Sequence, residues 1–177
     1  HKGDGEHITV ADVQQELDRI KYKIKPLDII LIQTGADAAW GTEKYLVTGA
    51  GMDRDSTLFL TEKGVKVVGI DAWSWDRPLP FLAKEFQETG DPGVIWEAHF
   101  AGIERGYCHM EKLSNLDTLP GDGFEISCFP YKIKGAGMAV DHIVAFTGHG
   151  GNSIRNWTTG NEPQDIMEFL DQAQAND

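Results

Sequence analysis

The chain has 177 residues, of which 41% are apolar, so it is long enough and apolar enough to form one globular domain with a hydrophobic core. Its formal net charge of -12 argues against nucleic acid and anionic membrane surfaces as partners, because like charges repel. No apolar run is long enough to cross a bilayer, and the first residues lack the features of a signal peptide, so we expect a cytoplasmic protein.

The first half of the chain predicts an α/β fold with a parallel sheet. Thr9 is suited to cap a helix over residues 10–22, and the β-branched run over 28–33 predicts a strand buried on both faces. A second helix is expected over 53–63, and a second buried strand over 65–71. A strand, a helix and another strand in this order predict a parallel crossover.

The second half predicts a short helix over 81–89 and two strands, over 124–133 and 140–147, joined by a glycine-rich turn. The composition then changes to glycine, asparagine, serine and threonine before a last short helix. We therefore expect one domain over residues 1–147 and a C-terminal extension with a short helix over 148–177.

The two cysteines, Cys108 and Cys128, lie in apolar, strand-like surroundings and form no Cys-x-x-Cys pair. This pattern favours buried thiols in a reducing compartment, and a single disulfide between the two residues is the alternative.

Three residues between positions 99 and 111 are candidates for metal chemistry. His99 and Glu111 are too far apart for one helix face, but a helix or loop followed by a turn would bring both into one pocket. An imidazole and a carboxylate suit zinc or manganese. The alternative is a core histidine with an ion-paired glutamate, and spacing alone favours it. His109 would point the same way as Glu111 on a strand, and we interpret it as a supporting or structural residue, with a ligand role left open.

A second cluster follows the predicted strand over 65–71. Asp71 and Asp76 flank Trp73 and Trp75 at the carboxyl end of this strand, where open α/β sheets bind ligands. Two indoles beside carboxylates could clamp a planar aromatic substrate. A tryptophan-rich corner of the core, with an aspartate that caps a turn, explains the same residues equally well.

Five segments together resemble the cyclase family of metal-dependent hydrolases, which includes bacterial kynurenine formamidase and isatin hydrolase. They follow the family order and comprise residues 32–35, 51–65, 68–76, His99 with 111–116, and 129–134. The Asp-Ala-Trp-Ser-Trp-Asp run is more similar to isatin hydrolases than to formamidases.

The resemblance implies a swivelling β/β/α fold and a divalent metal, manganese or zinc, at which water attacks an amide carbonyl and breaks its C-N bond. It implies that His99 and Glu111 are catalytic residues and correspond to second-site metal ligands of members with two metals; in single-metal members this histidine lies close to the catalytic centre. His99 would position or deprotonate the water, and Glu111 would orient it or hold a metal. Trp73, Trp75 and Asp71 would then bind a small aromatic amide, such as an N-formyl aromatic or an isatin-like ring. Family members are commonly dimers or tetramers, so we expect a homodimer or homotetramer, to which the extension could contribute.

One family feature is absent. The signature His-x-Gly-Thr-His-x-Asp-x-Pro-x-His, which supplies the primary metal ligands, does not occur in these 177 residues, and His1 does not replace it. Either the chain is the C-terminal part of a longer enzyme, with the fold incomplete at its N-terminus, or it is a variant without the metal centre. The start at His1 favours the first explanation, and the reading frame upstream would distinguish the two. We predict that these residues alone cannot hold the primary metal and are inactive or nearly so. The competing hypothesis is an inactive ligand-binding or subunit-interaction protein that keeps the fold without the primary metal site.

Overall fold

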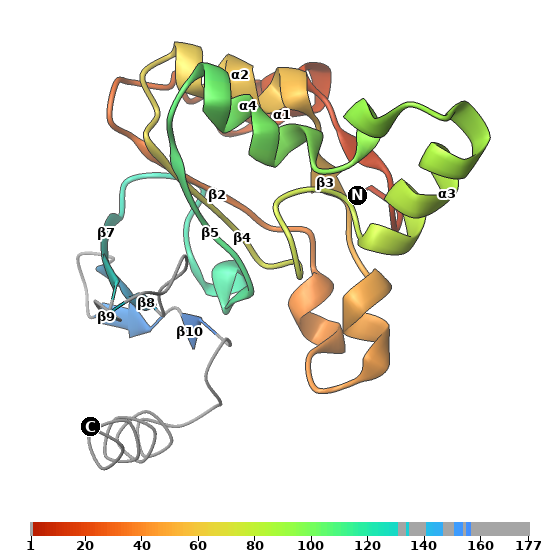
Figure 1. Ribbon diagram of the computed structural model, residues 1–177. Coiled ribbons are helices and arrows are strands. Elements are labelled where there is room, and N and C mark those ends of the chain that lie inside the picture. The colour runs from red at the N-terminus through yellow and green to blue at the C-terminus, as the bar shows by residue number, and fades with distance from the viewer. Residues whose placement is uncertain (1, 131–133, 135–140, 147–150, 154, 157–177) are drawn as a thin grey trace.

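The computed structural model describes residues 2–130, 134, 141–146, 151–153 and 155–156 (Figure 1). Its α-helices are α1 (Val10–Ile20), α2 (Arg54–Glu62), α3 (Leu79–Thr89) and α4 (Glu97–Glu104). Its strands are β1 (His7–Ile8), β2 (Ile29–Ile32), β3 (Gly51–Met52), β4 (Val67–Ile70), β5 (Cys108–Met110), β6 (Leu113–Ser114), β7 (Glu125–Pro130), β8 (Asp141–Phe146), β9 (Gly151–Ser153) and β10 (Arg155–Asn156). Four short 3-10 helices are η1 (Ala36–Ala39), η2 (Glu43–Val47), η3 (Pro92–Val94) and η4 (Leu116–Thr118).

The centre of the fold is a parallel sheet in the order β2-β4-β5. Ile29 pairs with Val67 and Ile32 with Ile70, and α2 lies between the two strands in the chain, so the predicted crossover is confirmed. In Figure 1, α1, α2 and α4 cover one side of this sheet, and β7 to β9 lie on the other side. Because β4 and β5 are parallel neighbours, the loops that follow them leave the sheet at the same edge.

Alternating side chains of the sheet enter two separate cores. Ile30 and Ile32 of β2 pack into a core on the helix side, whereas Ile29 and Leu31 pack into a second core with β7. The helix-side core includes Val13, Leu60, Val68, Ile70, Trp75 and Ala98. The second core includes Met110, Leu113, Leu116, Phe124 and Ile126. This period of two is what the pleat of a strand with both faces covered requires.

Helix α1 begins where the sequence predicts. The Thr9 hydroxyl accepts a hydrogen bond from the backbone N–H of Asp12 at 3.4 Å, and the Asp12 carboxylate accepts one from the backbone N–H of Thr9 at 2.8 Å. This reciprocal pair is a capping box, which satisfies two backbone donors that the first turn leaves open. Helices α2 and α3 also form within one or two residues of their predicted bounds.

Two predictions about burial need correction. All four residues of β2 are only half-buried, because β2 is an edge strand, while β4 in the centre has three fully buried residues. Cys108 is exposed rather than buried, because β5 is the other edge of the sheet. Cys128 is only half-buried, and the two cysteines form no disulfide, so both are thiols and the disulfide alternative is wrong.

In the second half of the chain, β7 and β8 form the predicted antiparallel pair, with Glu125 opposite Phe146 and Pro130 opposite Asp141. β9 pairs with β8, and β10 pairs with β6. The division into a domain over 1–147 and an extension over 148–177 stays a prediction, and the expected last helix lies outside the described residues. No helix in the described part of the chain combines the length and the apolar character that crossing a membrane requires.

Candidate active site

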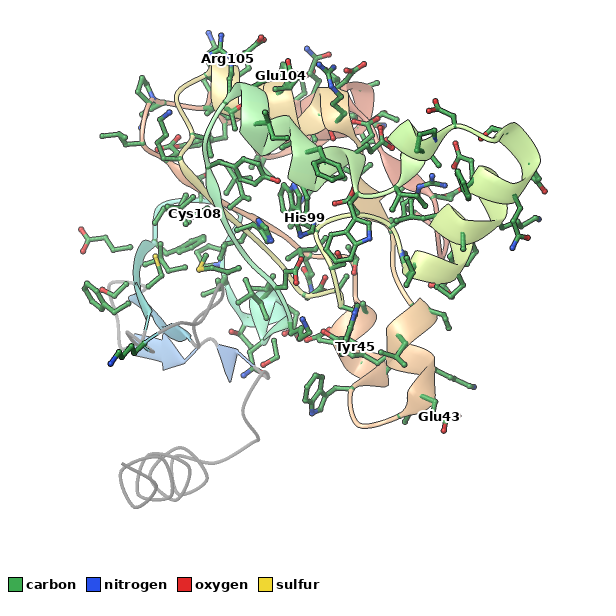
Figure 2. The ribbon with its side chains drawn as sticks, in the orientation of Figure 1. Glu43, Tyr45, His99, Glu104, Arg105 and Cys108 are labelled. Carbon is green, nitrogen blue, oxygen red and sulfur yellow. The ribbon has the colours of Figure 1, made fainter. Side chains whose placement is uncertain are left out.

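The candidate site lies where α4 passes the loops that follow β4 and β5. His99 is in the first turns of α4, and Glu111 follows the last residue of β5. Figure 2 shows His99 near the middle of the view, and Glu104 and Arg105, at the C-terminal end of α4, near the top. A helix and a turn thus bring His99 and Glu111 together, which their spacing allowed but did not require.

Three possible ligand side chains converge here. His99 Nε2 and His109 Nε2 each lie 3.5 Å from Glu111 Oε1. Within the described part of the chain, these three residues form the one group whose ligand atoms all lie within 4.8 Å of one another. Ligand atoms about 2 Å from a tetrahedral zinc ion are about 3.3 Å apart, so the donor set and its spacing fit a divalent metal.

His109 has a larger part in the site than the sequence indicated. Its ring centroid lies 4.4 Å from that of His99, and its strand points it to the same side as Glu111. Burial lowers the pKa of His109, and the Glu111 carboxylate, which acts in the opposite direction, does not restore it. The neutral imidazole is the form that binds metal ions.

Asp76 lies behind His99. Its carboxylate is almost completely buried and accepts hydrogen bonds from the backbone N–H groups of Ala98, at 2.8 Å, and His99, at 3.1 Å. The same carboxylate contacts His99 Nδ1. Sequence reasoning placed Asp76 beside the two tryptophans but missed its contact with His99, which spans 23 positions.

Glu111 is held from two directions. The backbone N–H of Trp75 donates to Glu111 Oε1 at 2.9 Å, and Lys112 Nζ lies 3.4 Å from Oε2. The Lys112 ammonium group also lies over the Trp73 ring, 4.4 Å from its centroid. Lys112 therefore links the candidate ligand to an aromatic side chain, and nothing in the sequence indicated this role beyond its position after Glu111.

The two tryptophans of the predicted aromatic pocket have different environments. Trp73 is 42% exposed, whereas Trp75 is fully buried and donates its indole N–H to Thr57 Oγ1 at 3.0 Å. Trp75 therefore presents no free ring face to a substrate. A third tryptophan, Trp96, is 42% exposed and lies beside His99, with 4.6 Å between ring centroids.

Asp71 is also internal. Its carboxylate has no exposed surface and accepts hydrogen bonds from the backbone N–H groups of Thr34 and Gly35 at 2.7 to 3.0 Å. Burial raises the pKa of Asp71, although these bonds act to lower it. The geometry assigns Asp71 to the junction between the ends of β2 and β4, inside the protein.

Two residues that flank the site have left-handed backbone conformations. Trp96, at the start of α4, has φ 61°, and Lys112, directly after Glu111, also has φ 61°. Side chains other than glycine and asparagine are disfavoured there, because Cβ approaches the following carbonyl oxygen. The loops on either side of His99 and Glu111 are therefore locally strained.

Comparison with known proteins finds a partial family match and solved structures with a similar fold. The Cyclase family model, described as putative cyclase, matches residues 1–77, a range that includes the Asp71 to Asp76 loop but neither His99 nor Glu111. No curated protein matches the chain.

Three solved structures share the fold. A crystal structure of an isatin hydrolase bound to the product analogue thioisatinate has a TM-score of 0.65 at 20% identity, over 80% of this chain and 53% of the other. Isatin hydrolase A from Labrenzia aggregata, bound to benzyl benzoate, has a TM-score of 0.65 at 19% identity, over 82% and 56% of the two chains. Isatin hydrolase A from Ralstonia solanacearum has a TM-score of 0.64 at 21% identity, over 80% and 53%.

The chain spans about half the length of these isatin hydrolases. The shared fold confirms the predicted architecture. With the family-model match over residues 1–77, it supports a cyclase-family relationship, and the fold is isatin hydrolase-like.

Proposed function

We propose that this chain carries the histidine–glutamate part of a metal-dependent amidohydrolase site. The substrate would be a small aryl amide or cyclic amide, of the isatin or N-formyl aromatic type. The observation that carries the proposal is the convergence of His99 Nε2 and His109 Nε2 on Glu111 Oε1, each at 3.5 Å. Two imidazoles and one carboxylate are a ligand set of catalytic zinc sites.

His99, His109 and Glu111 would hold the ion, manganese or zinc. When bound, such an ion supplies a water of lowered pKa and polarises a carbonyl oxygen. The second Glu111 oxygen, Oε2, which lies beside Lys112, would accept the proton of the attacking water. In the reaction the water oxygen joins the carbonyl carbon, the C-N bond breaks, and the nitrogen takes up the proton.

The exposed aromatic side chains support an aryl substrate. Trp73 and Trp96 are both partly exposed and lie next to the candidate ligands. The Trp73 ring lies under Lys112, which pairs with Glu111, and the Trp96 ring lies beside His99. Aromatic rings of this kind bind a planar ligand by stacking. We assign substrate contact to Trp73, with Trp96 as an additional candidate, and a supporting role to Trp75 and Asp71.

The proposal is tested first by metal binding. Titration calorimetry of the 177-residue chain with Zn²⁺ and Mn²⁺ should show binding of a single ion. The substitutions His99→Ala and Glu111→Gln should each weaken it at least about tenfold, because even residues behind the ligands change metal affinity about 10- to 100-fold. Glu104→Gln is the matched control, since Glu104 is an exposed carboxylate of the same helix that pairs with Arg54. Absence of metal binding, or equal affinity in all four proteins, would contradict the metal site.

Hydrolysis is tested separately with isatin and formanilide as substrates. Because the family signature run is absent from these residues, we expect the metal-loaded chain to show little or no turnover. Turnover with stoichiometric metal would refute this expectation while strengthening the assignment as an amidohydrolase. Metal-independent binding of an aromatic ligand would instead favour a ligand-binding protein that keeps the fold.

A further inference from the structure

We propose that Asp76 is the positioning residue that keeps the proton of His99 on Nδ1, so that Nε2 is the nitrogen offered to Glu111 and to a metal ion. This proposal rests on the proposed function and names the residue that orients the His99 ring. It concerns orientation only, and it can be tested in the chain with or without metal.

The contacts of Asp76 use both carboxylate oxygens. Oδ1 accepts from the backbone N–H of Ala98 at 2.8 Å, and Oδ2 accepts from the backbone N–H of His99 at 3.1 Å and contacts His99 Nδ1. The Asp76 side chain is only 2% exposed, so water does not compete for these positions. One carboxylate thus holds both the first turn of α4 and the ring that this turn carries.

The hydrogen bond between Asp76 and His99 decides which ring nitrogen of His99 carries the proton. An ionised carboxylate can only accept hydrogen bonds, so a ring nitrogen in contact with it must donate. With Nδ1–H directed at Asp76, the other ring nitrogen, Nε2, is the one 3.5 Å from Glu111 Oε1. A histidine that binds a metal through one nitrogen commonly donates its other N–H to a carboxylate, which fixes the ring and increases its basicity.

The backbone around Asp76 is fixed, which makes a positioning role effective. The backbone N–H of Met52 donates to the carbonyl oxygen of Trp75 at 2.8 Å. β3 approaches so closely that a Cβ atom on Gly51 would lie 2.1 Å from the backbone nitrogen of Arg77. The backbone N–H of the neighbouring Trp75 donates to Glu111 at 2.9 Å, so two consecutive residues orient two of the three candidate ligands, His99 and Glu111.

The test compares Asp76→Ala with Asp53→Ala. Asp53 is a matched control, because its carboxylate caps α2 by accepting from the backbone N–H of Ser56 at 2.7 Å and contacts no site histidine. Both substitutions remove a buried or half-buried carboxylate from a helix start. Only Asp76→Ala should change the ¹⁵N chemical shifts of the His99 ring toward a mixture of tautomers, and only it should weaken Zn²⁺ binding, by about 10- to 100-fold.

Asp76→Asn provides a second variant in case Asp76→Ala does not fold. Asparagine caps a helix about as well as aspartate, so a purely structural role predicts little change. Our proposal predicts weaker Zn²⁺ binding, because the charge that favours the Nδ1 proton is lost. Wild-type tautomer and Zn²⁺ affinity in both Asp76 variants would overturn it. If the wild-type chain binds no Zn²⁺, the proposed function fails, while the His99 tautomer in the metal-free chain still decides this proposal.

Discussion

Replacing Trp75 by phenylalanine should lower stability rather than remove a substrate contact. The indole is fully buried, and its N–H donates to Thr57 Oγ1 at 3.0 Å. Loss of that hydrogen bond costs about 1 kcal/mol. The vacated part of the indole is at least as large as a methyl group, and a void of that size costs about 1 kcal/mol more. We therefore expect Trp75→Phe to reduce the free energy of unfolding by about 2 kcal/mol.

The assay is urea unfolding followed by far-ultraviolet circular dichroism, because tryptophan fluorescence is itself changed by the substitution. For a chain of this length the corresponding fall in Tm is about 4 to 8 °C. Trp73→Phe is the matched control, since 42% of Trp73 is exposed, and it should change stability by less than about 0.5 kcal/mol.

The outcome that would refute this reasoning is a Trp75→Phe protein of unchanged stability with weaker binding of isatin. Such a result would return Trp75 to the aromatic pocket that the sequence predicted. In the expected case, isatin binding depends on Trp73, and Trp73→Ala weakens it without a matching loss of stability.

Two further substitutions test how the site is held and how pH acts on the fold. Gly51→Ala should destabilise the chain and weaken Zn²⁺ binding, because its Cβ would lie 2.1 Å from the backbone nitrogen of Arg77, next to Asp76. Urea unfolding measures the stability and calorimetry the Zn²⁺ affinity. Unchanged values of both would show that β3 can move away from Arg77. Burial lowers the pKa of His7 below 6.5, so the unfolded chain binds this proton more readily and stability should fall as pH decreases through about 6.5. His7→Gln should flatten that dependence in urea unfolding at pH about 7.5 and about 5.5, and an identical slope would assign it to other groups.

Local patterns were sufficient to predict much of the fold. The capping residue Thr9 and the apolar spacing after it define α1, and two β-branched runs with a helix between them define the β2–β4 crossover. These signals depend on neighbours within a few positions. The half-buried state of β2 was not predictable in this way, because it depends on which strand occupies the edge of the sheet.

The candidate site was predictable only in part. The spacing of His99 and Glu111 allowed a shared pocket, but the contact itself depends on how α4 crosses β5, and the same crossing brings His109 into the group. The two tryptophans lie in an irregular loop, where no period indicates which side chain turns inward. Long-range packing of this loop against β3 and α2 decides that Trp75 is buried and Trp73 is not.

The left-handed conformations of Trp96 and Lys112 have a consequence for the evolution of this protein. Each costs about 1 kcal/mol relative to a residue suited to that conformation, and both occur beside the candidate ligands. A laboratory selection for thermal stability alone should therefore enrich glycine or asparagine at positions 96 and 112, and a selection for Zn²⁺ binding should restore the larger side chains. The opposite outcomes of the two selections would then measure how much stability this protein gives up at these two positions for metal binding.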